Sequence, residues 1–104
     1  MTHEKLLNRA KLILRGVHGQ RLRGIILYGS YARGAGGPNS DIDLLVLLDG
    51  PIRYGRDLLA NLEALYPLAA ELQRRISAKP VDAKEYETVE CPLYQNAHRE
   101  GIAA

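Results

Sequence analysis

The fold is decided by the stretch Gly24-Ile25-Ile26-Leu27-Tyr28-Gly29-Ser30 and, ten residues later, Asp41-Ile42-Asp43-Leu44-Leu45-Val46-Leu47-Leu48. Each stretch contains a short apolar run, 24–28 and 44–48, that predicts a buried strand. The second run is apolar at every position, which is typical of a central strand covered on both faces. Between the runs, residues 29–34 predict a turn with a short helix, and residues 35–40 have the composition of a turn.

Apolar residues at helical spacing flank this centre. Leu6 to Val17 recur at three- and four-residue steps and predict a helix over 4–17, which Thr2 would cap. A second series runs from Leu58 to Ile76, and Pro67 inside it predicts a kink or two abutting helices.

The last third of the chain predicts one more strand and one more helix. Val81-Asp82-Ala83 follows the Lys79-Pro80 break and is expected to start a third strand. Pro92 suits the first turn of a last helix that ends near Gly101. The expected fold class is therefore α/β (α+β), with helices packed on a small mixed β-sheet of at least three strands.

Composition and length predict one ordinary globular domain over residues 1–104. The chain is 46% apolar and 25% charged, which excludes collagen-like, low-complexity and wholly disordered proteins. A single cysteine, Cys91, forms no internal disulfide, and no segment resembles a signal peptide. The longest apolar run, Leu44 to Leu48, is too short to cross a bilayer. We therefore expect a cytoplasmic protein without a membrane partner.

The net charge of +2 is unevenly distributed. Residues 1–40 contain seven Lys or Arg and one acid, so this half could attract a phosphate-bearing ligand or simply present a solvated basic helix face. The balance is far from the basic footprint of a dedicated nucleic-acid binder, so a nucleic-acid partner is not expected.

Asp41 and Asp43 are the first candidate site. They are two residues apart at the head of a strand, so their side chains lie on the same face. Two like charges near a buried sheet repel each other and lose hydration. A divalent cation such as Mg²⁺ would compensate, since it prefers carboxylate oxygens and shares its shell with substrate phosphates. The alternative is a pair of solvated aspartates.

Gly29 and Ser30 are the second candidate site. A glycine directly after a strand lets the backbone approach a ligand, and a serine at a helix start can hold a phosphate. The alternative is that Ser30 only caps the helix. The segment is neither a Walker A loop, because Ala35 stands where the lysine is needed, nor a dinucleotide-binding fingerprint.

The joint pattern of strand, Gly29-Ser30, ten residues, Asp41-x-Asp43 and apolar strand resembles the nucleotidyltransferase superfamily that includes DNA polymerase β. The segments Gly-Ser-Tyr-Ala-Arg-Gly (29–34) and Ser-Asp-Ile-Asp-Leu-Leu-Val (40–46) resemble the minimal nucleotidyltransferases of prokaryotes, the MNT family. Members of that family are often MntA-type antitoxins paired with a HEPN-domain toxin. The resemblance implies the polymerase β-like fold.

The resemblance also implies further site residues. The family uses a third carboxylate on a neighbouring strand, and Asp82 matches that position, with Glu85 as the substitute if the register differs. Asp41, Asp43 and Asp82 would then hold two Mg²⁺ ions and carry catalysis. Gly29, Ser30 and Arg33 would bind the nucleotide, although a salt bridge from Arg33 that orients the loop is an equal alternative.

The implied activity is Mg²⁺-dependent transfer of AMP from ATP to a hydroxyl, the tyrosine of a partner HEPN toxin being the leading acceptor. One alternative is a catalytically weak antitoxin that acts by binding its toxin. Another is nucleotidyl transfer to a small molecule or an RNA end. The chain is not the toxin itself, because the toxin family's Arg-x(4–6)-His-x-Tyr motif has no match: Arg99 and Glu100 follow His98.

Overall fold

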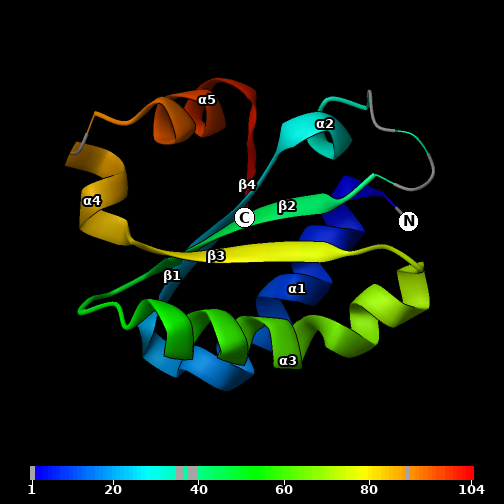
Figure 1. Ribbon diagram of the computed structural model, residues 1–104, viewed down its shortest axis with the longest axis horizontal. Coiled ribbons are helices and arrows are strands. Elements are labelled where there is room, and N and C mark those ends of the chain that lie inside the picture. The colour runs from blue at the N-terminus through cyan, green and yellow to red at the C-terminus, as the bar shows by residue number, and fades with distance from the viewer. Residues whose placement is uncertain (1, 35–36, 38–39, 89) are drawn as a thin grey trace.

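A mixed β-sheet forms the centre of the protein (Figure 1). The computed structural model describes residues 2–34, 37, 40–88 and 90–104, and within them the sheet has four strands in the order β3-β2-β1-β4. The strands are β1 (Leu22–Tyr28), β2 (Ile42–Leu48), β3 (Ile76–Asp82) and β4 (Ile102–Ala103). β1 is antiparallel to β2 and β4, whereas β2 and β3 are parallel. The predicted fold class is confirmed.

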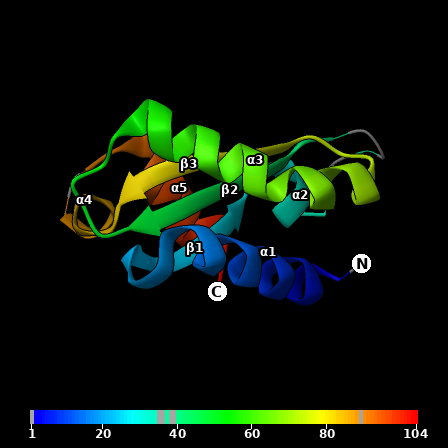
Figure 2. The ribbon, with the colours of Figure 1, turned by 90° about the horizontal axis from the view of Figure 1, so that it is seen from below.

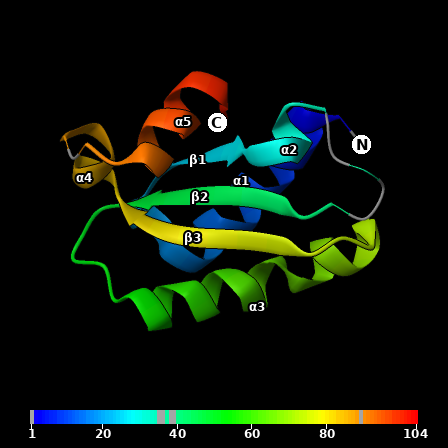
Figure 3. The same cartoon turned by 45° about the horizontal axis from the view of Figure 1, so that its top comes forward.

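Helices cover both faces of this sheet (Figures 2 and 3). The helical segments are α1 (His3–His18), η1 (Gly19–Arg21), α2 (Gly29–Ala32), α3 (Tyr54–Leu72), α4 (Ala83–Thr88) and α5 (Pro92–Glu100). α1 and α3 pack together on one face, and α4 and α5 lie on the other. None of the helices in the described part of the chain combines the length and the apolar character needed to span a membrane.

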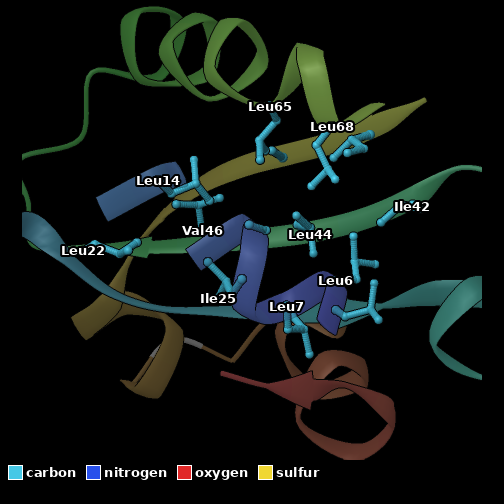
Figure 4. Close-up of a cluster of buried hydrophobic side chains, with 14 of the residues drawn as sticks. Leu6, Leu7, Leu14, Leu22, Ile25, Ile42, Leu44, Val46, Leu65 and Leu68 are labelled. Atoms are coloured by element: carbon cyan, nitrogen blue, oxygen red, sulfur yellow. The ribbon is translucent and has the colours of Figure 1, made fainter. Parts of the chain in front are cut away.

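The alternation of side chains along β2 divides the core in two. Ile42, Leu44, Val46 and Leu48 belong to the cluster under α1 and α3, where Figure 4 shows several of them packed against leucines of those helices. Leu45 belongs to the second cluster, under α4 and α5. The prediction that this strand is covered on both faces is confirmed. Because Asp43 alternates with Leu44, its side chain lies on the α4–α5 face.

Two helix predictions are confirmed. The helix predicted over 4–17 is α1, and the Thr2 hydroxyl accepts a hydrogen bond from the Lys5 backbone N–H at 3.1 Å, as an N-cap does. The last helix begins at Pro92 and ends before Gly101. The short helix after the first strand is α2, while the turn predicted over 35–40 lies mostly outside the described residues.

The prediction is wrong in the region between α3 and β3. α3 runs unbroken through Pro67 and ends at Leu72, and Gln73 follows with a left-handed φ of 53°. Ile76 therefore starts β3 and is not the last residue of a helical series. The Lys79-Pro80 step is not a break either, since a proline is tolerated in a strand at the edge of a sheet. The third strand thus ends, and does not begin, at Val81-Asp82.

An ion pair between a partly exposed arginine and a buried aspartate fixes the start of α3. Asp57 is 5% exposed, and its two carboxylate oxygens accept hydrogen bonds from the Arg21 guanidinium at 3.1 and 3.0 Å. The backbone N–H of Arg53 donates to the same carboxylate at 3.1 Å, which satisfies a free donor at the helix N-terminus. The hydrogen bonds from Arg21 are the main reason that the pKa of Asp57 lies below its ordinary value.

Asp57→Asn is expected to lower the free energy of unfolding by about 2 kcal/mol at neutral pH, as for other hydrogen bonds to charged groups. Because folding lowers the pKa of Asp57, its contribution is full above the pKa of the unfolded chain and disappears as the pH falls through the folded pKa. Urea unfolding of both proteins from pH 7 down to pH 3 measures this difference. A difference that stays constant over that range would show that the charge of Asp57 is not its cause.

Candidate active site

The paired carboxylates lie at the end of the sheet where β1 ends and β2 begins. Asp43 is the second residue of β2 and is half-buried, while Asp41 precedes the strand and is exposed. Burial raises the pKa of Asp43 above its ordinary value, the negative charge of Asp41 raises it further, and the positive charge of Lys79 opposes both. The two carboxylates are therefore close enough to repel each other, as their spacing in the sequence predicts.

The Gly-Ser segment meets the same carboxylate. Tyr28, the last residue of β1, pairs with Asp43, so Gly29 comes directly beside it. Gly29 has a φ of +79°, and a Cβ on it would lie 2.6 Å from Asp43 Oδ2. Glycine suits this position, because it adopts the left-handed backbone without strain and leaves the Asp43 carboxylate in place. Ser30 follows in α2, so the structure brings both predicted halves of the site together.

Arg74, which the sequence analysis missed, contacts both the α2 segment and the residue that precedes Asp41. Arg74 Nη1 donates to the backbone oxygen and to the Oγ of Ser40, each at 3.1 Å. Its guanidinium also lies over the Tyr31 ring, 5.0 Å from the ring centroid, a cation–π distance. Arg74 thus links α2 with the segment that leads into Asp41. No local pattern indicates this role, since the partners are more than thirty residues away.

Arg33 is engaged on the surface. Its Nη1 forms an ion pair with Glu100 Oε2 at 3.0 Å, and both side chains are nearly half exposed. This pair joins α2 to α5 and corresponds to the loop-orienting alternative that the sequence left open. An exposed pair of this kind contributes less than about 1 kcal/mol, so Arg33 can exchange Glu100 for a phosphate at little cost. The phosphate contact itself stays a prediction.

Asp82 does not join the site, and this prediction is wrong. In the parallel register Asp43 pairs with Ser77, whereas Asp82 pairs with Leu48 at the other end of β2. Five residues at about 3.3 Å each place it roughly 16 Å further along the sheet. There its Oδ1 accepts hydrogen bonds from the backbone N–H groups of Lys84 and Glu85, at 2.8 and 3.3 Å, and caps α4.

The substitute, Glu85, lies on α4 beyond Asp82 and is equally remote. In the part of the chain that the structure describes, no group of three or more His, Cys, Asp or Glu side chains could hold a metal ion. The candidate metal ligands are therefore Asp41 and Asp43 without a third carboxylate.

Ser77 and Lys79 occupy the place on β3 where the third carboxylate was expected. Ile76 and Ala78 belong to the cluster under α1 and α3, and Val81 to the cluster on the opposite face, so Ser77 and Lys79 share the face of Asp43. Both are half-buried, and none of the ion pairs formed among the described residues includes Lys79. The sequence analysis missed them because it placed Ile76 at the end of a helical series and interpreted Lys79-Pro80 as a break before the strand.

A groove of about 530 Å³ reaches Asp41 from the face of the sheet that α3 covers. Its walls come from the last turns of α3 and the start of β3, and they include Leu62, Tyr66 and Arg75. Leu62 is 40% exposed and Tyr66 is 71% exposed, so much of the wall is apolar surface in contact with water. The exposed carboxylate is thus accessible from this side to a large molecule.

The geometry of Gly29 against the Asp41–Asp43 pair agrees with a family comparison. The family model described as a nucleotidyltransferase domain matches residues 11–103. The chain belongs to this nucleotidyltransferase family. The family match thus covers β1, α2 and β2, which carry Gly29, Ser30 and Asp43.

A sequence relative with a suggested activity is also similar to this chain. A candidate protein adenylyltransferase of Methanocaldococcus jannaschii is 38% identical over 66 residues, which are 64% of this chain and 66% of the relative. This chain thus matches just under two thirds of the length of that relative.

Two solved structures share the fold. One is a crystal structure of a toxin-antitoxin with AMP-PNP, at 27% identity and a TM-score of 0.67 over 92% of this chain and 69% of the other. Another is spectinomycin adenyltransferase AAD(9) from Enterococcus faecialis with ATP and spectinomycin, at 25% identity and a TM-score of 0.63. That match covers 88% of this chain and 38% of the other.

Proposed function

We propose that this nucleotidyltransferase transfers AMP from ATP to a tyrosine hydroxyl of a partner protein, a HEPN-domain toxin, and acts as its antitoxin. The observation that carries the proposal is the packing of Gly29 against Asp43, which joins a backbone segment open to phosphate with a pair of carboxylates. The similarity to a candidate protein adenylyltransferase and to a toxin-antitoxin with AMP-PNP supports ATP as the donor and a protein as the acceptor.

The residues at this end of the sheet fit Mg²⁺. Asp41 and Asp43 are oxygen donors whose mutual repulsion contributes to the raised pKa of Asp43, so a hard divalent cation would relieve an unfavourable arrangement. Asp41 and Asp43 would hold it, and Asp82 takes no part. When bound, Mg²⁺ would neutralise phosphate charge and stabilise the attacking and leaving oxygens of the displacement.

The chain's own residues hold the nucleotide in this proposal. Gly29 lets the backbone of α2 approach the β- and γ-phosphates, because it carries no side chain on the side of Asp43. The Ser30 hydroxyl donates to a phosphate oxygen, and Arg33 adds a positive charge once it leaves Glu100. The acceptor hydroxyl then attacks the α-phosphate, and pyrophosphate leaves.

One observation favours a second candidate function. Among the residues that the structure describes, the site has two carboxylates in place of the expected three, and the third is the group that would take the proton of the acceptor. This favours an antitoxin that binds its toxin without modifying it. Both functions require a complex with the toxin, so complex formation alone does not separate them.

Measuring the intact mass of the partner protein separates the enzymatic function from the binding-only function. We expect that the partner HEPN-domain protein gains AMP when it is incubated with this protein, ATP and Mg²⁺, and that EDTA prevents the gain. A partner that forms a stable complex but keeps its mass would support the binding-only antitoxin. A partner that neither binds nor gains mass would contradict both functions.

A further inference from the structure

One row of residues crosses the sheet at the candidate site. Tyr28 of β1 pairs with Asp43 of β2, and Asp43 pairs with Ser77 of β3. Gly29 follows Tyr28, so the phosphate-binding segment of the proposal lies on the β1 side of Asp43. Ser77 lies on the opposite side, about one strand spacing of 4.8 Å away. Lys79 lies two residues further along β3, where it pairs with Leu45.

The chemistry of the proposed transfer assigns a role to each side. In an in-line displacement the attacking and leaving oxygens stand on opposite sides of the phosphorus. If Gly29 and Ser30 hold the β- and γ-phosphates, pyrophosphate leaves on the β1 side and the acceptor oxygen arrives on the β3 side.

On the β3 side, where the acceptor would arrive, the structure has the positively charged side chain of Lys79 in place of the expected carboxylate base. Lys79 shares the face of Asp43, and it forms none of the ion pairs among the described residues. A nearby ammonium group does not take the proton of an alkyl hydroxyl. It does favour the ionised form of a phenol, whose ordinary pKa of about 10 is low enough for a nearby positive charge to matter.

We propose that Lys79 is a catalytic residue that binds the phenolate oxygen of the acceptor tyrosine on the β3 side of Asp43. This inference rests on the proposed function. The phenol first releases its proton to solvent, and Lys79 keeps its own proton throughout. The phenolate oxygen then forms a bond to the α-phosphorus of ATP. The bond from that phosphorus to the oxygen bridging the β-phosphorus breaks, and pyrophosphate leaves with the electron pair.

The test compares Lys79→Met, which keeps the length of the side chain but not its charge, with Lys79→Arg and with Lys84→Met. Lys84 is an exposed lysine in α4, just beyond the opposite end of β3, so it serves as the matched control. With the partner protein, ATP and Mg²⁺, Lys79→Met should lower kcat/KM for the partner by about 100-fold, as for loss of one charge-stabilising group. Lys79→Arg should recover most of the rate, Lys84→Met should match the wild type, and calorimetry should give all four proteins the same affinity for ATP.

A partner grown with 3-fluorotyrosine provides a second readout that a structural role of Lys79 would not move. Fluorine lowers the pKa of the phenol, so this partner should restore much of the rate of Lys79→Met and change the wild-type rate much less. Lys79→Gln serves as a further neutral variant should Lys79→Met fold poorly.

The outcomes separate the inference from the proposed function. If the wild type transfers no AMP to the partner, the proposed function fails and the role of Lys79 fails with it. If the wild type transfers AMP and Lys79→Met does so equally well, the function stands and Lys79 is not catalytic. If Lys79→Met binds ATP more weakly and 3-fluorotyrosine restores nothing, Lys79 acts on the nucleotide, which also overturns the inference.

Discussion

Asp43→Asn is expected to reduce the rate of AMP transfer by about 10³-fold and to leave the fold intact. The substitution keeps the shape of the side chain but removes one of the two charges that would bind Mg²⁺, whose electrostatic stabilisation of the transition state is worth several kcal/mol. Burial and the Asp41 carboxylate already disfavour the charged form of Asp43, so losing the charge should not lower the free energy of unfolding. In calorimetry, Mg²⁺ should tighten ATP binding to the wild type and have no such effect on Asp43→Asn.

Asp82→Asn is the matched control, because it makes the same chemical change about 16 Å away. Asparagine caps helices nearly as well as aspartate, so α4 should keep its N-cap. We expect a transfer rate within twofold of the wild type, in agreement with the position of Asp82 and against its role as a third metal ligand. An Asp82→Asn protein as inactive as Asp43→Asn would return Asp82 to the site.

Gly29→Ala is expected to weaken ATP binding and to slow AMP transfer by about 100-fold, since misplacing reactive groups by about 1 Å has rate effects of this size. A methyl group at this position would lie 2.6 Å from Asp43 Oδ2, so either the carboxylate or the start of α2 must move. The left-handed backbone, with φ at +79°, adds strain of order 1–3 kcal/mol and should lower the thermal unfolding midpoint. Calorimetry with Mg²⁺ and ATP, together with a melting curve, measures both effects.

Gly34→Ala separates the effect of backbone strain from the effect of the close contact with Asp43. Gly34 also has a positive φ, +71°, but nothing lies within 4 Å of a Cβ placed on it. The melting temperature should therefore fall by a similar amount, while ATP affinity stays near that of the wild type. Equal losses of affinity in the two variants would mean that the contact between Gly29 and Asp43 does not organise the site.

Local patterns were sufficient for the centre of the fold. The apolar run Leu44 to Leu48 predicted a strand covered on both faces, and the two-residue spacing of Asp41 and Asp43 placed both carboxylates together. The same reasoning failed for Ile76 and the residues after it, because an apolar residue at helical spacing from Leu72 fits a helix as well as it fits the first position of a strand.

The sequence by itself determined that Gly29 and Asp43 lie together, since β1 and β2 are close in the chain and their pairing follows from two apolar runs and a short connection. Only the tertiary structure decided which residue of β3 faces Asp43. That register joins segments more than thirty residues apart, and burial of Ile76 and Ala78 under α3 sets it. A sequence motif does not encode a pairing of this kind. In the structure Ser77 lies beside Asp43, and Asp82 caps a helix at the opposite end of the sheet.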